Sequence, residues 1–296
     1  MKSINLKAYG KINLSLDITG RREDGYHLVR MVMQTVDIYD KLYMEKTEDG
    51  NISMEINIPF VPCDSSNIVY KAIDLIRKEY NIKEGIHVKL FKAIPVSAGM
   101  GGGSADAAAA LKGMNRLFSL RMSGAKLREY AARLGADVPY LVDGGTCLAE
   151  GIGEILTPIE GIPSCKLIIV KPKASASTKH VYTKYDEAER TYHPDVDGMV
   201  EAIKDGDLNK MCSLLGNVLE EVTAGEVAAV NELKSELTAY GAKGVLMSGS
   251  GTTVFGIFSE DADTKKIKSE LMKRENVRSV FDSRFVVNKG GKTVYA

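Results

Sequence analysis

Four glycines within residues 99–103, followed at once by an alanine-rich segment, constrain this chain more than any other feature. Residues 86–91 have the pattern of a strand, and the alanines predict a helix over 104–118. The first N–H groups of a helix lack partners inside the helix, and the helix dipole places partial positive charge there. Because glycines leave those groups uncovered, the loop predicts a site for phosphate, above all that of a nucleoside triphosphate. The loop consists of Pro95, Val96, Ser97, Ala98, Gly99, Met100, Gly101, Gly102, Gly103 and Ser104.

Other glycine-rich loops do not fit this spacing. A Walker loop requires Lys after its last glycine, and none follows Gly103. A dinucleotide-binding fingerprint requires glycine where Ser104 stands. The His-Arg-Asp and Asp-Phe-Gly signatures of protein kinases are absent. A flexible linker is disfavoured, because linkers are not followed by an alanine-rich helix with Ser at its start.

Composition excludes several classes of function. The 296 residues include 39 Lys and Arg against 39 Asp and Glu, so the basic excess that nucleic acid or an anionic membrane would need is missing. The sequence contains no apolar run of 18 residues, and its first residues lack the apolar core of a signal peptide. We therefore expect a small-molecule substrate, no nucleic-acid or membrane partner, and a monomer or homodimer.

The cysteines and histidines are scattered along the sequence. The cysteines form no C-x-x-C pair, which favours reduced, mostly buried thiols of a cytoplasmic protein. The histidines form no cluster with metal-ligand spacing, so the sequence indicates no metal ligands. These residues are Cys63, Cys147, Cys165, Cys212, His27, His87, His180 and His193.

Chain length favours two domains, and composition shifts near residues 161–164, so we predict domains over 1–162 and 163–296. Strands and helices mix in both, which indicates an α+β protein. The first domain is expected to contain strands over 4–8, 12–18, 29–38, 41–46, 52–58 and 86–91, helices over 67–80, 104–118 and 123–134, and a hairpin over 146–156. The second is expected to contain a strand over 167–170, a loop to about 194, helices over 195–204, 207–221, 225–240 and 261–274, and strands over 244–247, 253–258 and 277–287.

Two segments near the N-terminus carry polar side chains that could face a ligand. In a strand, Lys11 and Asn13 point to the same face, which meets either solvent or a ligand. Tyr26 and His27 follow a charged turn and offer a flat ring and a donor/acceptor pair. Those parts can stack on and read a nucleobase, although an ordinary surface turn is the alternative.

Two further segments could contribute to a site. Asp137 follows a predicted helix, and Pro139 is expected to hold Val138 extended, so the carboxylate suits either a general base or a helix cap. Residues 248–252, Ser-Gly-Ser-Gly-Thr, lie between two predicted strands. A hairpin turn explains this second glycine loop, and beside a phosphate loop it becomes a candidate wall of the same cleft.

Taken together, these segments resemble the galactokinase/homoserine kinase/mevalonate kinase superfamily of small-molecule kinases. Residues 95–108 resemble its phosphate loop. Within the superfamily the chain resembles the 4-diphosphocytidyl-2-C-methyl-D-erythritol kinase family. The resemblance is densest over 8–158 and thin over 174–240, and it lies in residues 8–14, 24–27, 95–108, 134–139, 149–156 and 249–251.

The resemblance implies a fold and a reaction. The fold would pair an N-terminal domain similar to domain 2 of ribosomal protein S5 with a ferredoxin-like C-terminal domain. The reaction would transfer the γ-phosphate of ATP to the 2-hydroxyl of a cytidine-diphosphate methylerythritol, a step of non-mevalonate isoprenoid synthesis. ATP and Mg²⁺ are thereby implied, with the ligands of Mg²⁺ unknown.

The resemblance also implies roles for residues. Asp137 would be the catalytic base and Lys11 the cation beside it. Residues 95–105 would bind ATP, with Ala105 where relatives usually have a second Ser. Ser104 is then the hydroxyl near the phosphates, and whether it or a carboxylate holds Mg²⁺ stays open. The remaining implied contacts are Lys92 and Asn67 to the adenosine of ATP, and Asn13, Tyr26, His27 and Tyr182 to the cytidine.

Three other functions compete with this hypothesis. Kinases of the same superfamily act on mevalonate or homoserine, but those acceptors lack a nucleobase for Tyr26 and His27 to hold. A nucleotide-binding regulator without catalysis is disfavoured because both Lys11 and Asp137 are present. An S5-like RNA-binding module is disfavoured by the neutral charge and the phosphate loop.

Overall fold

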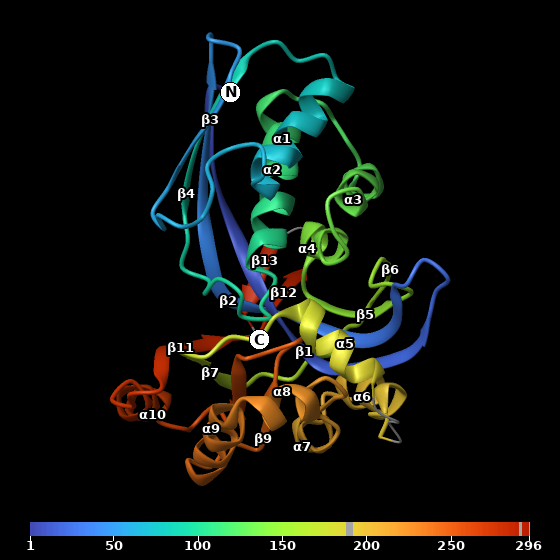
Figure 1. Ribbon diagram of the computed structural model, residues 1–296, viewed down its shortest axis with the longest axis vertical. Helices are drawn as coiled ribbons and strands as arrows, with labels where there is room; N and C mark the ends of the chain where they lie inside the picture. The colour runs from blue at the N-terminus through green and yellow to red at the C-terminus, as the bar shows by residue number, and fades with distance from the viewer. Residues whose placement is uncertain (188–191, 290–291, 296) are drawn as a thin grey trace. The chain divides into compact units, whose positions relative to one another are not determined.

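The computed structural model describes residues 1–187, 192–289 and 292–295. Its elements form two compact units that interleave along the chain (Figure 1). The first unit comprises Met1–Gly10, Ile38–Val96 and Gly101–Asp143, and the second comprises Lys11–Asp37, Ser97–Met100 and Gly144–Ala296. Both units are discontinuous in sequence, so the division into domains 1–162 and 163–296 stays a prediction.

Two long strands, β1 (Ser3–Arg21) and β2 (His27–Thr47), contribute residues to both units. In the first unit, the end of β2 pairs antiparallel with β4 (Gly85–Phe91), and β4 pairs parallel with β3 (Ile52–Ile56). Buried aliphatic side chains alternate along β4, which gives this sheet one apolar face. That face provides the surface on which the helices of the unit pack.

The helices of the first unit are α1 (Ile68–Glu79), α2 (Gly102–Leu117), α3 (Gly124–Ala132) and α4 (Val138–Asp143). Helix α2 packs against α1 and α4 (Figure 1). Its alanines are almost all buried, and a Cβ atom at Gly113 would lie 2.3 Å from Met44 Sδ. The small side chains therefore let α2 approach strand β2 closely.

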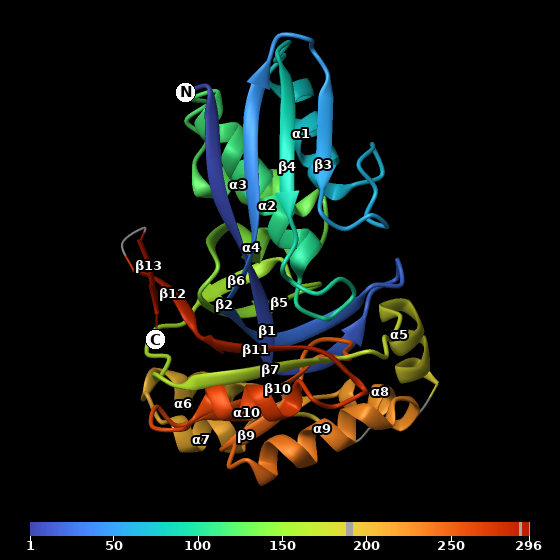
Figure 2. The same ribbon diagram turned by 90° about the vertical axis from the view of Figure 1, so that its left-hand side faces the viewer.

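The second unit contains a four-stranded sheet in the order β11-β7-β10-β9 with every neighbouring pair antiparallel. Its strands are β7 (Lys166–Pro172), β9 (Gly244–Met247), β10 (Val254–Phe258) and β11 (Val277–Arg284). Helices α9 (Ala228–Ala239) and α10 (Thr264–Leu271) cover one face (Figure 2). The core between these layers includes Ile168, Val170, Val230, Leu233, Leu237, Met247, Val254 and Phe258.

The other elements of the second unit surround this sheet. Strand β5 pairs with β6 and with residues 31–34 of β2, and β8 pairs parallel with Ser15 and Leu16 of β1. Their bounds are β5 (Thr146–Glu150), β6 (Ile155–Pro158), β8 (Gly216–Asn217), β12 (Val286–Lys289), β13 (Lys292–Tyr295), α5 (Thr178–Asp186), α6 (Val196–Lys204), α7 (Leu208–Ser213) and α8 (Glu220–Glu226).

Several predicted elements differ from those observed. The strands predicted over 4–8 and 12–18 are one strand, β1, and those over 29–38 and 41–46 are one strand, β2. Pairing with neighbouring strands keeps the backbone extended across the residues where a break was predicted. The helix predicted over 207–221 is interrupted, since residues 216–217 pair with β1. The loop predicted to about 194 contains α5, whose cap is Ser177; residues 188–191 of that loop lie outside the described residues.

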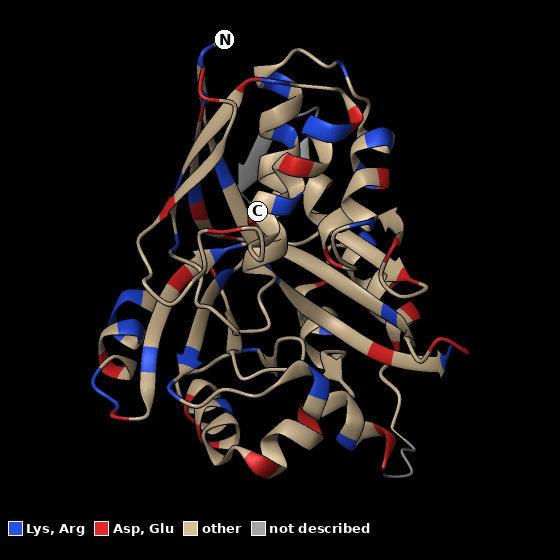
Figure 3. Ribbon diagram, turned by 45° about the horizontal axis from the view of Figure 1, so that its top comes forward, with Lys and Arg blue, Asp and Glu red and all other residues tan. Residues whose placement is uncertain are grey.

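The distribution of charged residues and the hydropathy of the helices agree with the expectations from composition. Figure 3 shows basic and acidic residues scattered over the helices and strands. Among the described residues, none of the helices combines the length and the apolar character that crossing a bilayer requires.

Candidate active site

The phosphate loop, residues 95–104, leads into helix α2 as predicted, but the helix begins two residues earlier than expected. Gly101 is the N-cap residue in a left-handed conformation, with φ of 66°, and no side chain caps the helix. Ala105 N donates to Gly101 O over 2.8 Å. Ser104 thus lies in the first turn and not at its start. The uncapped first turn, built from Gly102 and Gly103, suits an anionic ligand.

The loop is braced by the second glycine loop, residues 248–252, within the second unit. Gly99 has φ of +70°, and a Cβ atom there would lie 2.3 Å from Ser248 O. Ser248 Oγ donates to Gly99 O over 3.1 Å, and Ser248 N donates to Thr253 O over 2.9 Å. The second glycine loop is therefore both the hairpin turn between β9 and β10 and the predicted wall beside the phosphate loop. That prediction is confirmed.

A cavity of about 430 Å³ opens where these loops meet the segment before α5. Thr178 Oγ1 and Ser250 Oγ lie 2.9 Å apart and join two of its sides. Hydroxyl groups and bare backbone dominate its walls, which are features that bind phosphate oxygens. This hydroxyl pocket is lined by Ser97, Gly99, Ser175, Ala176, Ser177, Thr178 and Gly251.

Lys11 and Asn13 share one face of β1, as their spacing predicted. Both side chains are buried, and Lys11 Nζ donates to Asn13 Oδ1 over 2.8 Å. Lys11 N also donates to Met100 O of the phosphate loop over 3.0 Å. The backbone that carries the Lys11 ammonium is therefore tied to the loop, and the amide of Asn13 orients the ammonium.

The three rings that the resemblance assigns to the cytidine divide into a pair and a separate ring. His27 and Tyr182 lie with ring centroids 4.8 Å apart, although their sequence positions are remote. His27 Nε2 lies 2.7 Å from Asp186 Oδ1, and Arg21 pairs with the same carboxylate. Tyr26, in contrast, is 60% exposed. Helix α5 thus supplies both the ring and the carboxylate that position His27.

Lys92 and Asn67, the implied adenosine contacts, lie in the first unit. The Lys92 ammonium is buried between two carboxylates, with Asp106 Oδ2 at 2.5 Å and Asp40 in closer contact. Burial alone would lower the pKa of Lys92, but Asp106 and Asp40 together raise it. Burial raises the pKa of Asp106 well above its usual range. Asn67 caps α1, because its side chain accepts a hydrogen bond from Val69 N over 2.8 Å.

Asp137 is half-buried and directly precedes α4 in the first unit. Leu141 N donates to Asp137 O over 3.3 Å. The expectation that Pro139 holds Val138 extended is wrong, since both belong to the first turn of α4, where proline is tolerated. Helix α4, and not an extended segment, therefore fixes the backbone of Asp137.

Metal-ligating side chains do not gather in the described ranges. No group of three or more His, Cys, Asp or Glu side chains that could hold a metal ion occurs there. Near the start of α2, Ser104 carries a hydroxyl and Asp106, two residues on, carries a carboxylate whose Oδ2 pairs with Lys92.

Comparison with known proteins adds to this geometry. The profile of the GHMP kinases N terminal domain matches residues 67–145, and that of GHMP kinases C terminal matches residues 199–277. The 4-diphosphocytidyl-2-C-methyl-D-erythritol kinase of Lachnospira eligens is 48% identical over 95% of this chain and 98% of that protein. That of Lachnoclostridium phytofermentans is 46% identical over 98% and 99%. The chain belongs to the 4-diphosphocytidyl-2-C-methyl-D-erythritol kinase family.

The fold agrees with this family. A crystal structure of 4-(cytidine 5'-diphospho)-2C-methyl-D-erythritol kinase superposes with a TM-score of 0.79 at 28% identity, covering 95% of this chain and 98% of that one. Homoserine kinase from Cytophaga hutchinsonii has the same fold, with a TM-score of 0.76 at 18% identity over 99% of this chain and 98% of that one. The predicted α+β small-molecule kinase fold is confirmed.

Sequence reasoning missed part of this 4-diphosphocytidyl-2-C-methyl-D-erythritol kinase family member's site. Residues 175–178 line the hydroxyl pocket, yet Tyr182 alone of the loop predicted to about 194 was expected to contact a ligand. A signal was present, because Ser177 precedes Val181 and Tyr185, which are spaced for one buried helix face.

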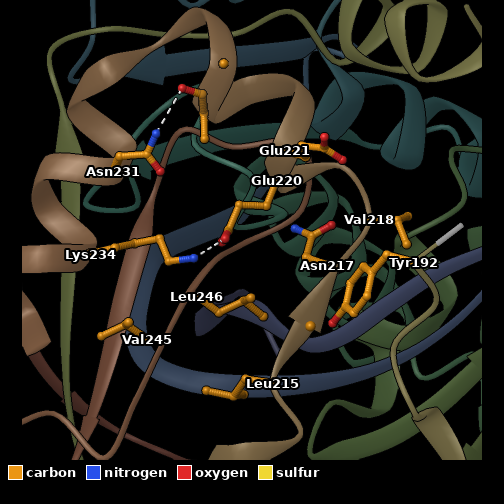
Figure 4. Close-up of a pocket in the computed structure, with 13 residues that line it drawn as sticks. Tyr192, Leu215, Asn217, Val218, Glu220, Glu221, Asn231, Lys234, Val245 and Leu246 are labelled. Carbon is orange, nitrogen blue, oxygen red and sulfur yellow. Dashed lines mark hydrogen bonds and ion pairs between the residues drawn. The ribbon is translucent and has the colours of Figure 1, made fainter. Parts of the chain in front are cut away.

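A second cavity, of about 560 Å³, lies behind the second glycine loop in this family member (Figure 4). Asn217 donates to Met247 O over 2.9 Å and to Gly249 O over 2.8 Å. Glu220 accepts a hydrogen bond from Met247 N over 2.7 Å and pairs with Lys234. Residues that line this cavity therefore hold the base of the second glycine loop.

Proposed function

We propose that this chain transfers the terminal phosphoryl group of ATP to the 2-hydroxyl of 4-diphosphocytidyl-2-C-methyl-D-erythritol, a step of non-mevalonate isoprenoid synthesis. One observation supports this acceptor over the others. Helix α5 bears Thr178 on the hydroxyl pocket and, four residues later, Tyr182 against His27. Four residues of helix rise about 6 Å, a distance that a ribose spans between a nucleobase and its phosphates.

On the acceptor side, the cytosine would stack on Tyr182 and be read by His27, with Asn13 and Tyr26 completing the site. The diphosphate would lie at the N-terminus of α5, where the hydroxyl pocket offers donors and the helix dipole favours negative charge. Asp186 holds the ring of His27, so the base would meet an oriented imidazole.

On the donor side, residues 95–105 would hold the triphosphate of ATP, with its adenosine near Asn67 and Lys92. The uncapped first turn of α2 presents N–H groups to the anion. Mg²⁺ would enter bound to the triphosphate, whose oxygens supply most of its ligands. Ser104 is the hydroxyl that fits beside it, because the nearby carboxylate of Asp106 is committed to Lys92.

Chemistry would rest on Asp137 and Lys11. Asp137 takes the proton of the acceptor hydroxyl as its oxygen attacks the γ-phosphorus, and the electron pair of the broken P–O bond leaves with ADP. The Lys11 ammonium offsets the negative charge that develops during transfer. Positioning and electrostatic stabilisation then supply most of the rate, as in phosphoryl transfer generally.

Composition and cysteine chemistry indicate the setting of the enzyme. Four free cysteines suit the reducing cytoplasm. Equal numbers of basic and acidic residues, 39 each, give no surface excess for nucleic acid. We propose a cytoplasmic monomer or homodimer.

Base selectivity tests the proposal. Purified protein would be assayed for ADP formation with the cytidine acceptor and with its uridine analogue. A site that hydrogen-bonds the cytosine edge leaves buried groups unpaired with uracil, so kcat/KM should fall at least about 100-fold. Mevalonate and homoserine serve as further acceptors and should give no turnover. Equal kcat/KM for the two nucleotides, or turnover of either small alcohol, would contradict the proposal.

A further inference from the structure

Lys171, near the end of β7, is a buried cation without a role in the proposed chemistry. Its side chain is only 2% exposed. The ammonium donates to three uncharged oxygens: Pro172 O at 3.0 Å, Ala174 O at 2.5 Å and Thr252 Oγ1 at 2.8 Å. Burial lowers the pKa of Lys171 to about 8, and Arg278 acts in the same direction. Burying an ammonium against neutral oxygens costs free energy, so Lys171 is a candidate for a role beyond packing.

Those bonds join two walls of the hydroxyl pocket. Ala174 directly precedes residues 175–178, and Thr252 directly follows Gly251. Thr252 Oγ1 also donates to Ala174 O over 2.7 Å, so Lys171, Ala174 and Thr252 form a closed set of hydrogen bonds. The contact between Thr178 and Ser250 is a second tie between the same walls. The distance between the two walls of the pocket therefore depends on the hydrogen bonds from Lys171 to Ala174 and Thr252.

We propose that Lys171 is a positioning residue for the diphosphate of the acceptor, acting through Ala174 and Thr252. This inference rests on the proposed function. All three N–H donors of the ammonium are engaged by the protein, so Lys171 acts on the substrate through the backbone it holds. Its loss should weaken acceptor binding, whereas the ATP site on α2 keeps its own supports.

The first test is Lys171→Met, which keeps the length of the side chain and removes its donors. Steady-state kinetics should show KM for the acceptor raised at least about tenfold, with KM for ATP unchanged within about twofold. Lys166→Met is the matched control. Lys166 lies at the other end of β7 and donates to Ala262 O over 2.7 Å, away from the pocket, so all constants should stay at wild-type values.

The second test is Thr252→Val, which removes one hydroxyl without changing side-chain volume. It should raise the acceptor KM by a smaller factor. The double variant with Lys171→Met should be no worse than Lys171→Met alone, because both substitutions break the same set of bonds. If Lys171→Met does not fold, as thermal unfolding would show, Thr252→Val decides the question.

These experiments distinguish failure of the proposed function from failure of the inference about Lys171. A wild-type chain that does not phosphorylate the cytidine acceptor overturns the proposed function and this inference with it. An active wild type whose folded Lys171→Met and Thr252→Val variants keep the acceptor KM, or raise the KM values of acceptor and ATP equally, overturns the inference alone.

Discussion

Lys92, Lys112 and Lys171 show how single residues accommodate a charge that lies wholly or partly away from water. Lys92 lies between two carboxylates, which raise its pKa against the effect of burial. Lys112 and Lys171 donate to carbonyl and hydroxyl oxygens instead, and burial lowers the pKa of each to about 8. The pKa of the lysine is raised where carboxylates contact the ammonium and lowered where its hydrogen bonds go to uncharged oxygens, whatever their number. All three ammonium groups connect segments that carry proposed site residues.

At the same scale, Asp137→Asn tests the proposed base. The amide keeps the size of the side chain and leaves the backbone bond from Leu141 N intact, so the variant should unfold at the wild-type temperature. Its kcat should fall by about 10²–10³, because a preorganised group that acts in the transition state is lost. The measurement is single-turnover phosphoryl transfer from labelled ATP.

Asp143→Asn is the control for that substitution. Asp143 ends α4, five residues after its start, and pairs with Arg128 at the surface. The control should retain full activity. Substantial turnover by Asp137→Asn would remove Asp137 as the base.

At the scale of elements, Lys112 connects the helix of the phosphate loop to the helix that follows Asp137. Its Nζ donates to Val142 O over 3.1 Å and to Leu141 O over 3.4 Å, at the carboxyl end of α4. A cation there also interacts favourably with the helix dipole. Helix α2 thus carries the proposed phosphate site at its start and holds α4 through Lys112.

Lys112→Met should change how stability depends on pH. Burial lowers the pKa of Lys112 from 10.5 to about 8 in the folded chain, with Asp143 opposing and Arg116 assisting. Between about pH 8 and 10.5 the unfolded chain holds a proton that the folded chain has released, so this residue makes wild-type stability rise with pH in that window. The variant should lose this residue's share of the rise, about 1.4 kcal/mol per pH unit at most, while Lys171 keeps its own share, as urea unfolding at pH 7.5 to 10 would reveal.

Lys71→Met removes an exposed lysine of α1 and should keep the wild-type pH dependence. Parallel curves for wild type and Lys112→Met would contradict the prediction.

At the scale of the whole molecule, thiol accessibility reports packing, because the three buried cysteines lie in the second unit and the exposed one lies in the first. Cys63 is exposed, whereas Cys147, Cys165 and Cys212 are buried. Burial raises the pKa of Cys212 to about 11 and that of Cys165 further, so these thiols are protonated as well as covered.

A disulfide reagent that forms a coloured product should therefore titrate one thiol in the native protein and four in guanidinium chloride. In Cys63→Ser the fast reaction should disappear. Two or more fast thiols in the native wild type would show that the core opens more readily than its packing indicates.

Local patterns in the sequence predicted the glycine loop, helix α2 and the shared face of Lys11 and Asn13, because each depends on residues near one another in the chain. The reaction class came from the resemblance of several such segments to a known family. The start of α2 was missed by two residues, since a left-handed glycine served as its cap in place of Ser104. The helical state of Val138 was also missed, because a proline in a first turn and a proline after an extended residue look alike in sequence.

What only the tertiary structure decided are the contacts between remote segments. The hydroxyl pocket joins residues 97–99, 175–178 and 251, Tyr182 meets His27, and Lys171 meets Thr252. Spacing along the chain does not predict such contacts. They arise from the pairing of β7 with β10 and from the packing around these strands. Periodicity and loop chemistry thus determined most of the elements and a phosphate site, and the resemblance to a known family added the reaction, whereas long-range packing determined which side chains share a cavity.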